Sequence, residues 1–288
     1  WFIPYFTNFT FVYRIKMKKL NSNSIYSLLS MKQKTALVIG GTGYLGKAMT
    51  LTLLELGAKV IIASRDKKRG EKALKDLKRK STNNKNIFFH TVDITDKSSL
   101  NNLKNFVSKK FNHKLDVLIN CGWSGKKNTF ESIDDDDWQY DIDTCLTGVF
   151  KTIKLFLPFL KKTKGNILNI GSAYSHVAPD YRMYDSFKYA NPPSYGAAKA
   201  GVVQLTKYCS SFFASYKIRV NCISPGAYPF PKTIKENPKF IKRLAEKCPA
   251  NRIGYPDDLK GTVALLCSDA GSFITGQNIL VDGGWSVW

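Results

Sequence analysis

The sequence predicts one α/β domain in which helices flank a doubly wound parallel sheet of about seven strands. Short apolar runs, typical of strands buried on both faces of a sheet, alternate with helical stretches from Thr35 onward. A glycine-rich turn joins the first apolar run to the first helical stretch. No internal repeat or linker divides the 288 residues, so a single domain is expected.

The expected strands are apolar runs, of which TALVIG is the first. They cover residues 35–40, 59–63, 87–92, 115–120, 165–170, 219–223 and 278–281. The expected helices cover residues 46–56, 68–78, 98–111, 138–160 and 195–213. Strands separated by helices in this way form a doubly wound sheet.

Residues 1–30 differ from the rest of the chain. The sequence opens on Trp1 and Phe2, whereas Met31 stands directly before the first apolar run, as a natural start would. We predict that residues 1–30 are a disordered or non-native extension and that residues 31–288 form the domain. Apolar residues precede the basic ones here, which is the reverse of a signal peptide. Attachment of this segment to a membrane surface is the alternative.

The composition narrows the classes of partner. Lys and Arg number 44 against 22 Asp and Glu, a net charge of +22, which would suit nucleic acid, an acidic carrier protein or an anionic metabolite. The basic residues are spread along the whole chain and no nucleic-acid motif accompanies them, so no nucleic-acid partner is expected. No run approaches the roughly 18 apolar residues of a membrane span, so no membrane partner is expected either.

The cysteines predict no disulfides, and the 3 histidines, which are scattered along the chain, predict no metal site. Six cysteines include no Cys-x-x-Cys pair, and a chain of this length needs no disulfides to be stable. We therefore expect reduced thiols and a cytoplasmic protein. The acidic run from Asp134 to Asp137 could hold magnesium, but it is better placed to cap the helix expected near Trp138.

The turn after the first strand predicts dinucleotide binding. Gly41, Gly43 and Gly46 form a Gly-x-Gly-x-x-Gly pattern, with Tyr44 and Leu45 between the last two glycines. Glycines at this spacing permit a tight turn and close approach of the backbone to a pyrophosphate at the N-terminus of a helix. The position between a strand and a helix makes the pattern specific.

The end of the second strand bears on the choice of cofactor. An acidic side chain at this point would hold the ribose 2′-hydroxyl of NAD, whereas Arg65 with Ser64 could hold the 2′-phosphate of NADP. The sequence therefore favours NADP. Asp66 keeps NAD open as the alternative.

Tyr195 and Lys199 are candidate catalytic residues. Their spacing places both side chains on one face of a helix. A phenol gives up its proton readily only where a nearby positive charge stabilises the phenolate, and Lys199 can supply that charge. The pair alone is common on surface helices, so its meaning depends on the rest of the chain.

Together these motifs resemble the short-chain dehydrogenase/reductase family over residues 33–288. The resemblance implies a Rossmann-type sheet, a small-molecule substrate and a homodimer or homotetramer. It also implies the following roles: Asp93 with Ile94 contacts adenine, Asn120 opens the family's Asn-Asn-Ala-Gly stretch, Ser172 is the catalytic serine, Tyr195 and Lys199 are the catalytic pair, and Pro225 and Gly226 close the nicotinamide-side loop.

The family mechanism assigns a task to each catalytic residue. In reduction the nicotinamide delivers hydride to a carbonyl carbon while Tyr195 protonates the oxygen. Ser172 hydrogen-bonds that oxygen, and Lys199 stabilises the tyrosine and holds the cofactor ribose. Oxidation is the reverse.

The chain departs from the family pattern at three places. The spacing of the glycine turn is more usual in the extended branch of the family. Cys145 stands where an asparagine usually supports a proton relay, which puts the relay in doubt. The insertion at residues 173–194, between Ser172 and Tyr195, is longer than usual and rich in tyrosine, so we expect it to border the substrate.

The insertion resembles that of members associated with flagellin modification and surface-polysaccharide sugars, which also tend to end in Asp-Gly-Gly-Trp, as residues 282–285 do. The expected lid, residues 227–250, is rich in lysine, which suits an anionic substrate but also a solvated helix. The sequence thus predicts a carbonyl reductase or alcohol dehydrogenase acting on a sugar-like or anionic substrate. The alternatives are a 3-oxoacyl carrier-protein reductase and a dinucleotide-binding regulator with little turnover.

Overall fold

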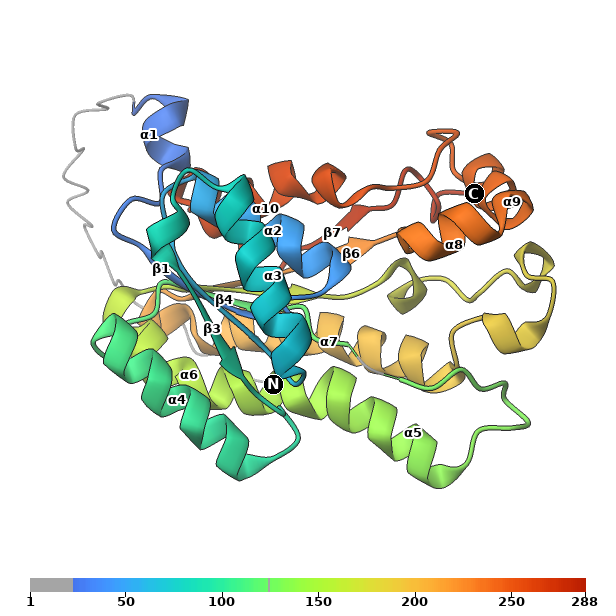
Figure 1. The fold of residues 1–288 in the computed structure, drawn as a ribbon, viewed down its shortest axis with the longest axis horizontal. Coiled ribbons are helices and arrows are strands. Elements are labelled where there is room, and N and C mark those ends of the chain that lie inside the picture. Colours follow the sequence, from blue (N-terminus) through green and yellow to red (C-terminus); the bar gives the residue numbers. More distant parts are fainter. Residues whose placement is uncertain (1–22, 124) are drawn as a thin grey trace, which may run out of the picture.

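The structure, a computed structural model, describes residues 23–123 and 125–288 (Figure 1). Seven parallel strands form one sheet, as predicted, and their order is β3-β2-β1-β4-β5-β6-β7. The strands are β1 (Thr35–Ile39), β2 (Lys59–Ser64), β3 (Ile87–Thr91), β4 (Val117–Asn120), β5 (Asn166–Ile170), β6 (Arg219–Pro225) and β7 (Asn278–Val281). The order reverses between β1 and β4, which opens a crevice at the carboxyl ends of these strands.

Helices cover both faces of the sheet. The α-helices are α1 (Ile25–Leu29), α2 (Tyr44–Glu55), α3 (Lys67–Lys80), α4 (Lys97–Phe111), α5 (Asp135–Ile142), α6 (Gly148–Thr163), α7 (Pro193–Phe212), α8 (Pro231–Glu236), α9 (Pro238–Lys247) and α10 (Lys260–Cys267). Shorter 3₁₀ turns are Asn84–Asn86, Ala173–Ser175, Tyr181–Met183, Phe187–Tyr189, Ala214–Tyr216, Pro256–Leu259 and Asp269–Gly271. The helices α8 and α9 lie at the end of the molecule opposite α1 (Figure 1).

The core consists of two apolar layers, one on each face of the sheet. Leu37 and Ile39 point toward α4, α6 and α7, whereas the alternating residues Ala36 and Val38 point toward α2, α3 and α10. All four side chains are buried, so β1 is covered on both faces, as its continuous apolar run predicts.

Residues 138–160, expected to form a helix, are helical along their whole length, in three consecutive segments. A π-helical turn, Asp143–Thr147, separates α5 from α6 and contains Cys145. The acidic run begins α5: Asp134 accepts a hydrogen bond from the backbone N–H of Asp137 at 2.7 Å, and Asp137 pairs with Lys126. These contacts are those of a helix cap. Within residues 23–123 and 125–288 no three His, Cys, Asp or Glu side chains cluster as metal ligands would.

The expected N-terminal extension is folded in its last part. Ser24 caps α1 by accepting a hydrogen bond from the backbone of Ser27, and α1 packs beside the 3₁₀ turn Asp269–Gly271. Met31 is buried, and its N–H donates to the carbonyl of Leu56. The prediction for residues 1–22 lies outside the described residues. None of the helices in the described part of the chain is long and apolar enough to cross a membrane.

The turn between β1 and α2 depends on glycines that pack against one another. Gly40 has a φ of +78°, and an added Cβ there would lie 2.7 Å from the backbone nitrogen of Gly122. A Cβ on Gly46 would lie 2.1 Å from the carbonyl oxygen of Gly40. The backbone therefore brings the start of α2 directly against the end of β1, which no larger residue at position 46 permits.

We expect Gly46→Ala to lower the free energy of unfolding by about 1–3 kcal/mol, because the methyl group must displace the turn. The matched control is Gly261→Ala in α10, where an added Cβ meets nothing within 4 Å. That change should leave the free energy of unfolding equal or raise it by up to about 1 kcal/mol, since alanine is the better helix former. Denaturant unfolding measures both, and equal effects would contradict the packing argument.

Candidate active site

One cavity of about 1110 Å³ opens at the carboxyl ends of the central strands. Its wall contains the turn after β1, the ends of β2 and β5, the loop after β4, the first turns of α7 and the segment after β6. The residues that sequence analysis assigned to catalysis or to the cofactor, and that line this cavity, are Gly43, Tyr44, Leu45, Gly46, Ser64, Arg65, Asp93, Ile94, Ser172, Tyr195, Lys199, Pro225 and Gly226. The fold thus brings together residues that are up to 183 positions apart in the sequence.

Two predicted cofactor residues do not line the cavity. A Cβ on Gly41 would meet the side chain of Ile62 at 2.6 Å, so this glycine permits packing of the turn on β2. Gly40 lines the cavity in its place. Two adjacent glycines, Gly40 and Gly41, fit the motif, and spacing alone does not show which of them faces the cavity.

Asn120 is the second predicted cofactor residue that does not line the cavity, and its side chain forms hydrogen bonds within the protein instead. Its side-chain N–H donates to Asn169 Oδ1 at 2.9 Å, and its Oδ1 accepts from Thr152 Oγ1 at 2.8 Å. Asn169 in turn donates to Thr206 Oγ1 at 2.9 Å. This buried chain of hydrogen bonds ties β4 and β5 to α6 and α7 directly behind the cavity.

The end of β2 presents donors to the cavity. Ser64 Oγ is buried and has no hydrogen-bond partner among the described residues, and Ser64 lines the cavity together with Arg65 and Arg69. The Arg65 guanidinium donates to the Tyr140 hydroxyl at 2.5 Å. Asp66 also lines the cavity, and its carboxylate caps α3 by accepting the backbone N–H of Arg69 at 2.9 Å. The end of β2 thus offers both hydrogen-bond donors and a carboxylate to a dinucleotide ribose.

Asp93 lies at the same end of the cavity as the glycine turn. Its Oδ1 accepts from the backbone N–H of Thr95 at 2.9 Å and from Thr95 Oγ1 at 2.7 Å. Burial acts to raise the pKa of Asp93, but the hydrogen bonds from Thr95, with help from Arg65, hold it below its ordinary value. Asp93 is therefore a fixed carboxylate acceptor beside the adenine end of the predicted cofactor site.

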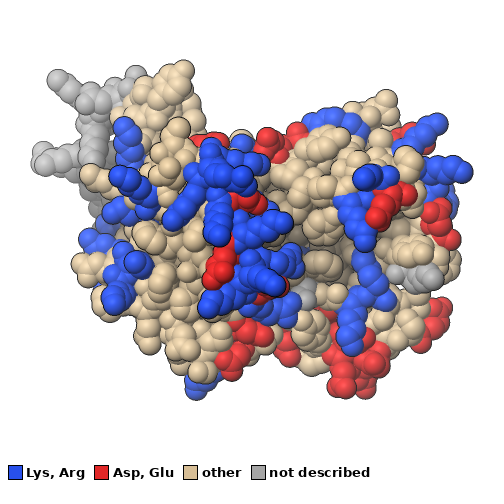
Figure 2. Space-filling view, viewed as in Figure 1, with Lys and Arg blue, Asp and Glu red and all other residues tan. Residues whose placement is uncertain are grey.

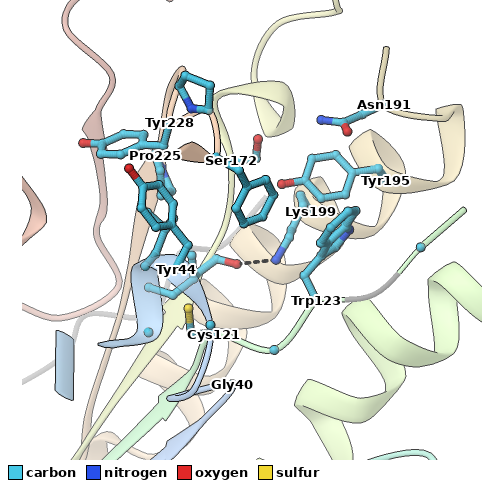
Figure 3. Close-up of a pocket in the computed structure, with 18 of the residues that line it drawn as sticks. Gly40, Tyr44, Cys121, Trp123, Ser172, Asn191, Tyr195, Lys199, Pro225 and Tyr228 are labelled. Carbon is cyan, nitrogen blue, oxygen red and sulfur yellow. Dashed lines mark hydrogen bonds between the residues drawn. The ribbon is translucent and has the colours of Figure 1, made fainter. Parts of the chain in front are cut away.

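Tyr195, Lys199 and Ser172 meet in the middle of the cavity (Figure 3). Lys199 is only 3% exposed, and its Nζ donates to the carbonyl of Ile170, the last residue of β5, at 2.7 Å. The same Nζ lies 5.8 Å from the centre of the Tyr195 ring. The Tyr195 hydroxyl points toward Ser172, whose Oγ accepts the backbone N–H of Tyr174 at 3.1 Å (Figure 3). Two hydroxyl groups therefore face one point beside a buried cation, as acid catalysis on a carbonyl oxygen requires.

The loop after β4 adds two residues that sequence analysis missed. The Trp123 ring lies edge-on to the Tyr195 ring, with 6.0 Å between centroids. Lys127 lines the cavity, and its Nζ donates to Asn191 Oδ1 at 2.7 Å. Both residues follow Asn120 in the loop after a strand end, which borders the crevice. This position is the sequence feature that could have identified them.

Cys145 is fully buried and does not line the cavity, whereas its neighbour Thr144 does. Cys145 lies in the π-helical turn, and the residues on either side of that turn, Ile142 and Gly148, keep helical φ and ψ angles. A proton relay through the side chain at position 145 therefore does not reach the cavity.

The insertion contributes tyrosines to the cavity wall. Tyr174, Tyr184 and Tyr189 all line it, and the hydroxyls of Tyr174 and Tyr184 are 2.8 Å apart. Burial raises the pKa of both Tyr174 and Tyr184 above the ordinary value, so they remain neutral hydrogen-bonding groups.

The lid presents no cation to the cavity among the described residues. The lid residues in the wall are Ala227, Tyr228, Pro229, Phe230, Thr233, Asn237, Phe240 and Leu244. Two of its basic residues instead bind the insertion: Arg243 pairs with Asp185 at 2.7 Å and donates to the carbonyl of Met183 at 2.8 Å, and Lys247 lies 3.6 Å from Asp180. Lys232 and Lys242 pair with Glu236 and Glu246 on the lid's own helices. The sequence left open whether the lid faces an anionic substrate or solvent, and the lid residues in the cavity wall favour solvent. Arg243 and Lys247 connect the lid to the insertion.

Comparison with known proteins identifies the family. Residues 43–286 match the family model described as Enoyl-(Acyl carrier protein) reductase. The uncharacterized oxidoreductase YgcW of Escherichia coli is 31% identical over 280 residues, covering 95% of this chain and 100% of that protein. The chain belongs to the short-chain dehydrogenase/reductase family. Another relative is the 3-oxoacyl-[acyl-carrier-protein] reductase FabG of Thermotoga maritima, 28% identical over 259 residues, which are 89% of this chain and 99% of FabG.

Solved structures of the family superpose on this fold. A putative gluconate dehydrogenase from Agrobacterium tumefaciens has a TM-score of 0.81 at 27% identity, covering 91% of this chain and 99% of that one. A short-chain dehydrogenase from Leptospira borgpetersenii with bound NAD⁺ has a TM-score of 0.75 at 31% identity, over 89% and 94% of the two chains. The RhlG/NADP complex of Pseudomonas aeruginosa has 0.81 at 25% identity, over 90% and 99%. The protein is accordingly a dehydrogenase or reductase that acts on CH–OH or carbonyl groups with a nicotinamide dinucleotide.

Proposed function

We propose that this protein interconverts a carbonyl and a secondary alcohol on a sugar-like substrate with NADP(H). The observation that carries the proposal is the meeting of the Tyr195 and Ser172 hydroxyls in a cavity whose wall also contains Tyr174, Tyr184 and Tyr189 of the insertion. Tyrosine hydroxyls and flat ring faces suit a polyhydroxylated ring, and a site that satisfies substrate hydroxyls discriminates against analogues without them. The likeness to a putative gluconate dehydrogenase supports a substrate of this class. A role in modifying flagellin or surface-polysaccharide sugars belongs to the same proposal.

The chemistry follows from the positions of three side chains. The bound dinucleotide would supply or accept hydride at the substrate carbon. Tyr195 gives its hydroxyl proton to the carbonyl oxygen during reduction, and Ser172 donates a hydrogen bond to the same oxygen. Lys199 is fixed by the Ile170 carbonyl at 2.7 Å, so its charge stays beside the Tyr195 ring and favours the phenolate left behind.

The preference for NADP is supported by the end of β2. Ser64 Oγ lacks a partner among the described residues, and both Arg65 and Arg69 line the cavity. Asp66, the residue that would favour NAD, is engaged in capping α3. A 2′-phosphate at this point gains charge-assisted hydrogen bonds that a 2′-hydroxyl cannot form.

A 3-oxoacyl carrier-protein reductase is the second candidate. FabG of Thermotoga maritima is similar over nearly the whole chain. Figure 2 shows Lys and Arg side chains gathered over α3 and over α8, with a hollow between the two groups. A basic rim of this kind suits an acidic carrier protein.

We also propose a cytoplasmic homodimer or homotetramer. Phe150 on α6 and Tyr208 and Phe212 on α7 are exposed aromatic side chains, which supports pairing of these helices between copies. All six cysteines are free, as suits a reducing compartment. Sedimentation velocity tests the assembly, and a monomer at micromolar concentration would contradict it.

Tyr195→Phe should lower kcat/KM by at least about 100-fold, because the ring still packs but the transferable proton is gone. The affinity for NADPH should persist. Tyr208→Phe is the matched control, since this exposed tyrosine on the same helix is absent from the cavity wall. Oxidation of NADPH is followed with keto-sugars, a 3-oxoacyl thioester and cyclohexanone.

The panel separates the candidate functions. Fastest turnover of a keto-sugar supports the proposal, and fastest turnover of the thioester favours the carrier-protein reductase. Tight cofactor binding with no turnover on any substrate would favour the regulator. Turnover of Tyr195→Phe near the parent rate would refute the assignment of the acid.

Arg65→Ala should weaken NADPH binding by about 10- to 100-fold and leave NADH binding nearly unchanged, because only NADPH carries the 2′-phosphate. Lys68→Ala provides the control, as Lys68 stands on α3 outside the cavity wall. Fluorescence titration of both cofactors gives the affinities. Equal affinity of the parent protein for NADPH and NADH would return the 2′ contact to Asp66.

A further inference from the structure

The substrate side of the cavity contains a cation with no anionic partner among the described residues. Apart from Lys199, whose ammonium donates to the Ile170 carbonyl, the charged side chains of the wall near the insertion are Lys127 and Asp185. Asp185 is neutralised by Arg243 at 2.7 Å and accepts from Asn237 at 3.3 Å. The contact of Lys127 is with a neutral amide, Asn191 Oδ1 at 2.7 Å.

The neighbouring Lys126, unlike Lys127, has an anionic partner among the described residues. Lys126 points away to the acidic start of α5, where it pairs with Asp137. Lys127 has no such pairing in the described part of the chain. Its side chain is exposed to solvent in the open cavity, although the neighbouring protein atoms lower the pKa of its ammonium. A cation that lies in the cavity without a counterion attracts anions, and an anionic ligand would supply the missing partner.

The loop that holds Lys127 is fixed by a buried carboxylate. Asp141 on α5 is 3% exposed and accepts from Ser194 Oγ at 2.6 Å and from the backbone N–H of Lys126. A Cβ on Gly125 would lie 2.7 Å from Asp141 Oδ1, so the loop backbone packs directly on this carboxylate. Asp141 therefore joins the loop after β4 to the first turn of α7.

This attachment sets Lys127 close to the reacting groups. Its partner Asn191 lies two residues before α7 begins, and Tyr195 lies in the first turn of that helix. Figure 3 shows Asn191 and Tyr195 on the same side of the cavity. A substrate whose carbonyl oxygen meets Tyr195 can thus extend a second polar group to Lys127.

We infer that Lys127 and Asn191 form a subsite for a carboxylate on the substrate, so that the sugar-like substrate is a sugar acid. The inference rests on the proposed function. The ammonium supplies one positive charge, and the Asn191 amide supplies N–H donors because its oxygen is already used by Lys127. The single positive charge of Lys127 balances the single negative charge of a carboxylate, whereas it would neutralise only half of the charge of a doubly ionised phosphate.

Binding measured by calorimetry in the presence of saturating NADP tests the subsite without requiring turnover. The probes are D-gluconate, the neutral polyol D-glucitol and glucitol 6-phosphate. The parent should bind gluconate about 10- to 100-fold more tightly than glucitol, the range expected of a charged hydrogen-bonded contact. Lys127→Met should remove that difference and Lys127→Arg should keep most of it. Lys126→Met is the matched control and should change nothing, and NADP affinity verifies that each variant is folded.

Several results would overturn the subsite. The first is equal affinity of the parent for gluconate and glucitol. The second is no detectable gluconate binding at about 10 mM, a concentration at which weak ligands still bind. The third is an equal loss of gluconate affinity in Lys127→Met and Lys126→Met. Tighter, Lys127-dependent binding of the phosphate would replace the carboxylate by a phosphate. Reduction of neutral keto-sugars alone would refute the subsite and leave the reductase function standing, whereas absence of turnover with intact gluconate binding would refute the reductase function and leave the subsite.

Discussion

The hydrogen bond from the buried ammonium of Lys199 to the Ile170 carbonyl at the end of β5 is the contact on which the active site depends. Removing an ammonium from water is costly unless it is hydrogen-bonded and faces an anion. The carbonyl fixes the cation at the carboxyl edge of the sheet, and the helix places Tyr195 one turn earlier on the same face. The pair is therefore positioned by the junction of β5 and α7.

Two further sets of contacts hold that junction in place. Behind it, the hydrogen-bonded chain through Asn120, Asn169 and Thr206 ties the central strands to the helices on one face. In front of it, the ion pair between Arg243 and Asp185 joins the lid to the insertion, so that both walls of the substrate region form one unit. The hydrogen-bonded chain and the ion pair thus hold the two sides of the cavity in which a substrate would meet the three candidate catalytic groups.

The sequence predicted the fold, and it named candidate catalytic residues that the structure brings into one cavity, because both depend on local pattern. Apolar runs and glycines locate strands and turns, and the order of motifs places Ser172 beside Tyr195. Lys127 was missed because its position depends on Asp141 and Asn191, which are distant in the sequence and give no periodic signal. Two interpretations of the basic lid stayed open for the same reason, since a count of lysines does not show that Arg243 and Lys247 bind acidic residues of the insertion.

The most direct test of the account is the transfer of deuterium to a keto-sugar from NADPH in which both hydrogens at the nicotinamide C4 position are replaced by deuterium. Mass spectrometry and NMR of the product alcohol locate the label. Hydride transfer beside Tyr195 predicts a deuterium on the carbinol carbon of each product molecule, with the new hydroxyl proton coming from solvent. Cofactor binding without any deuterium on carbon would contradict it.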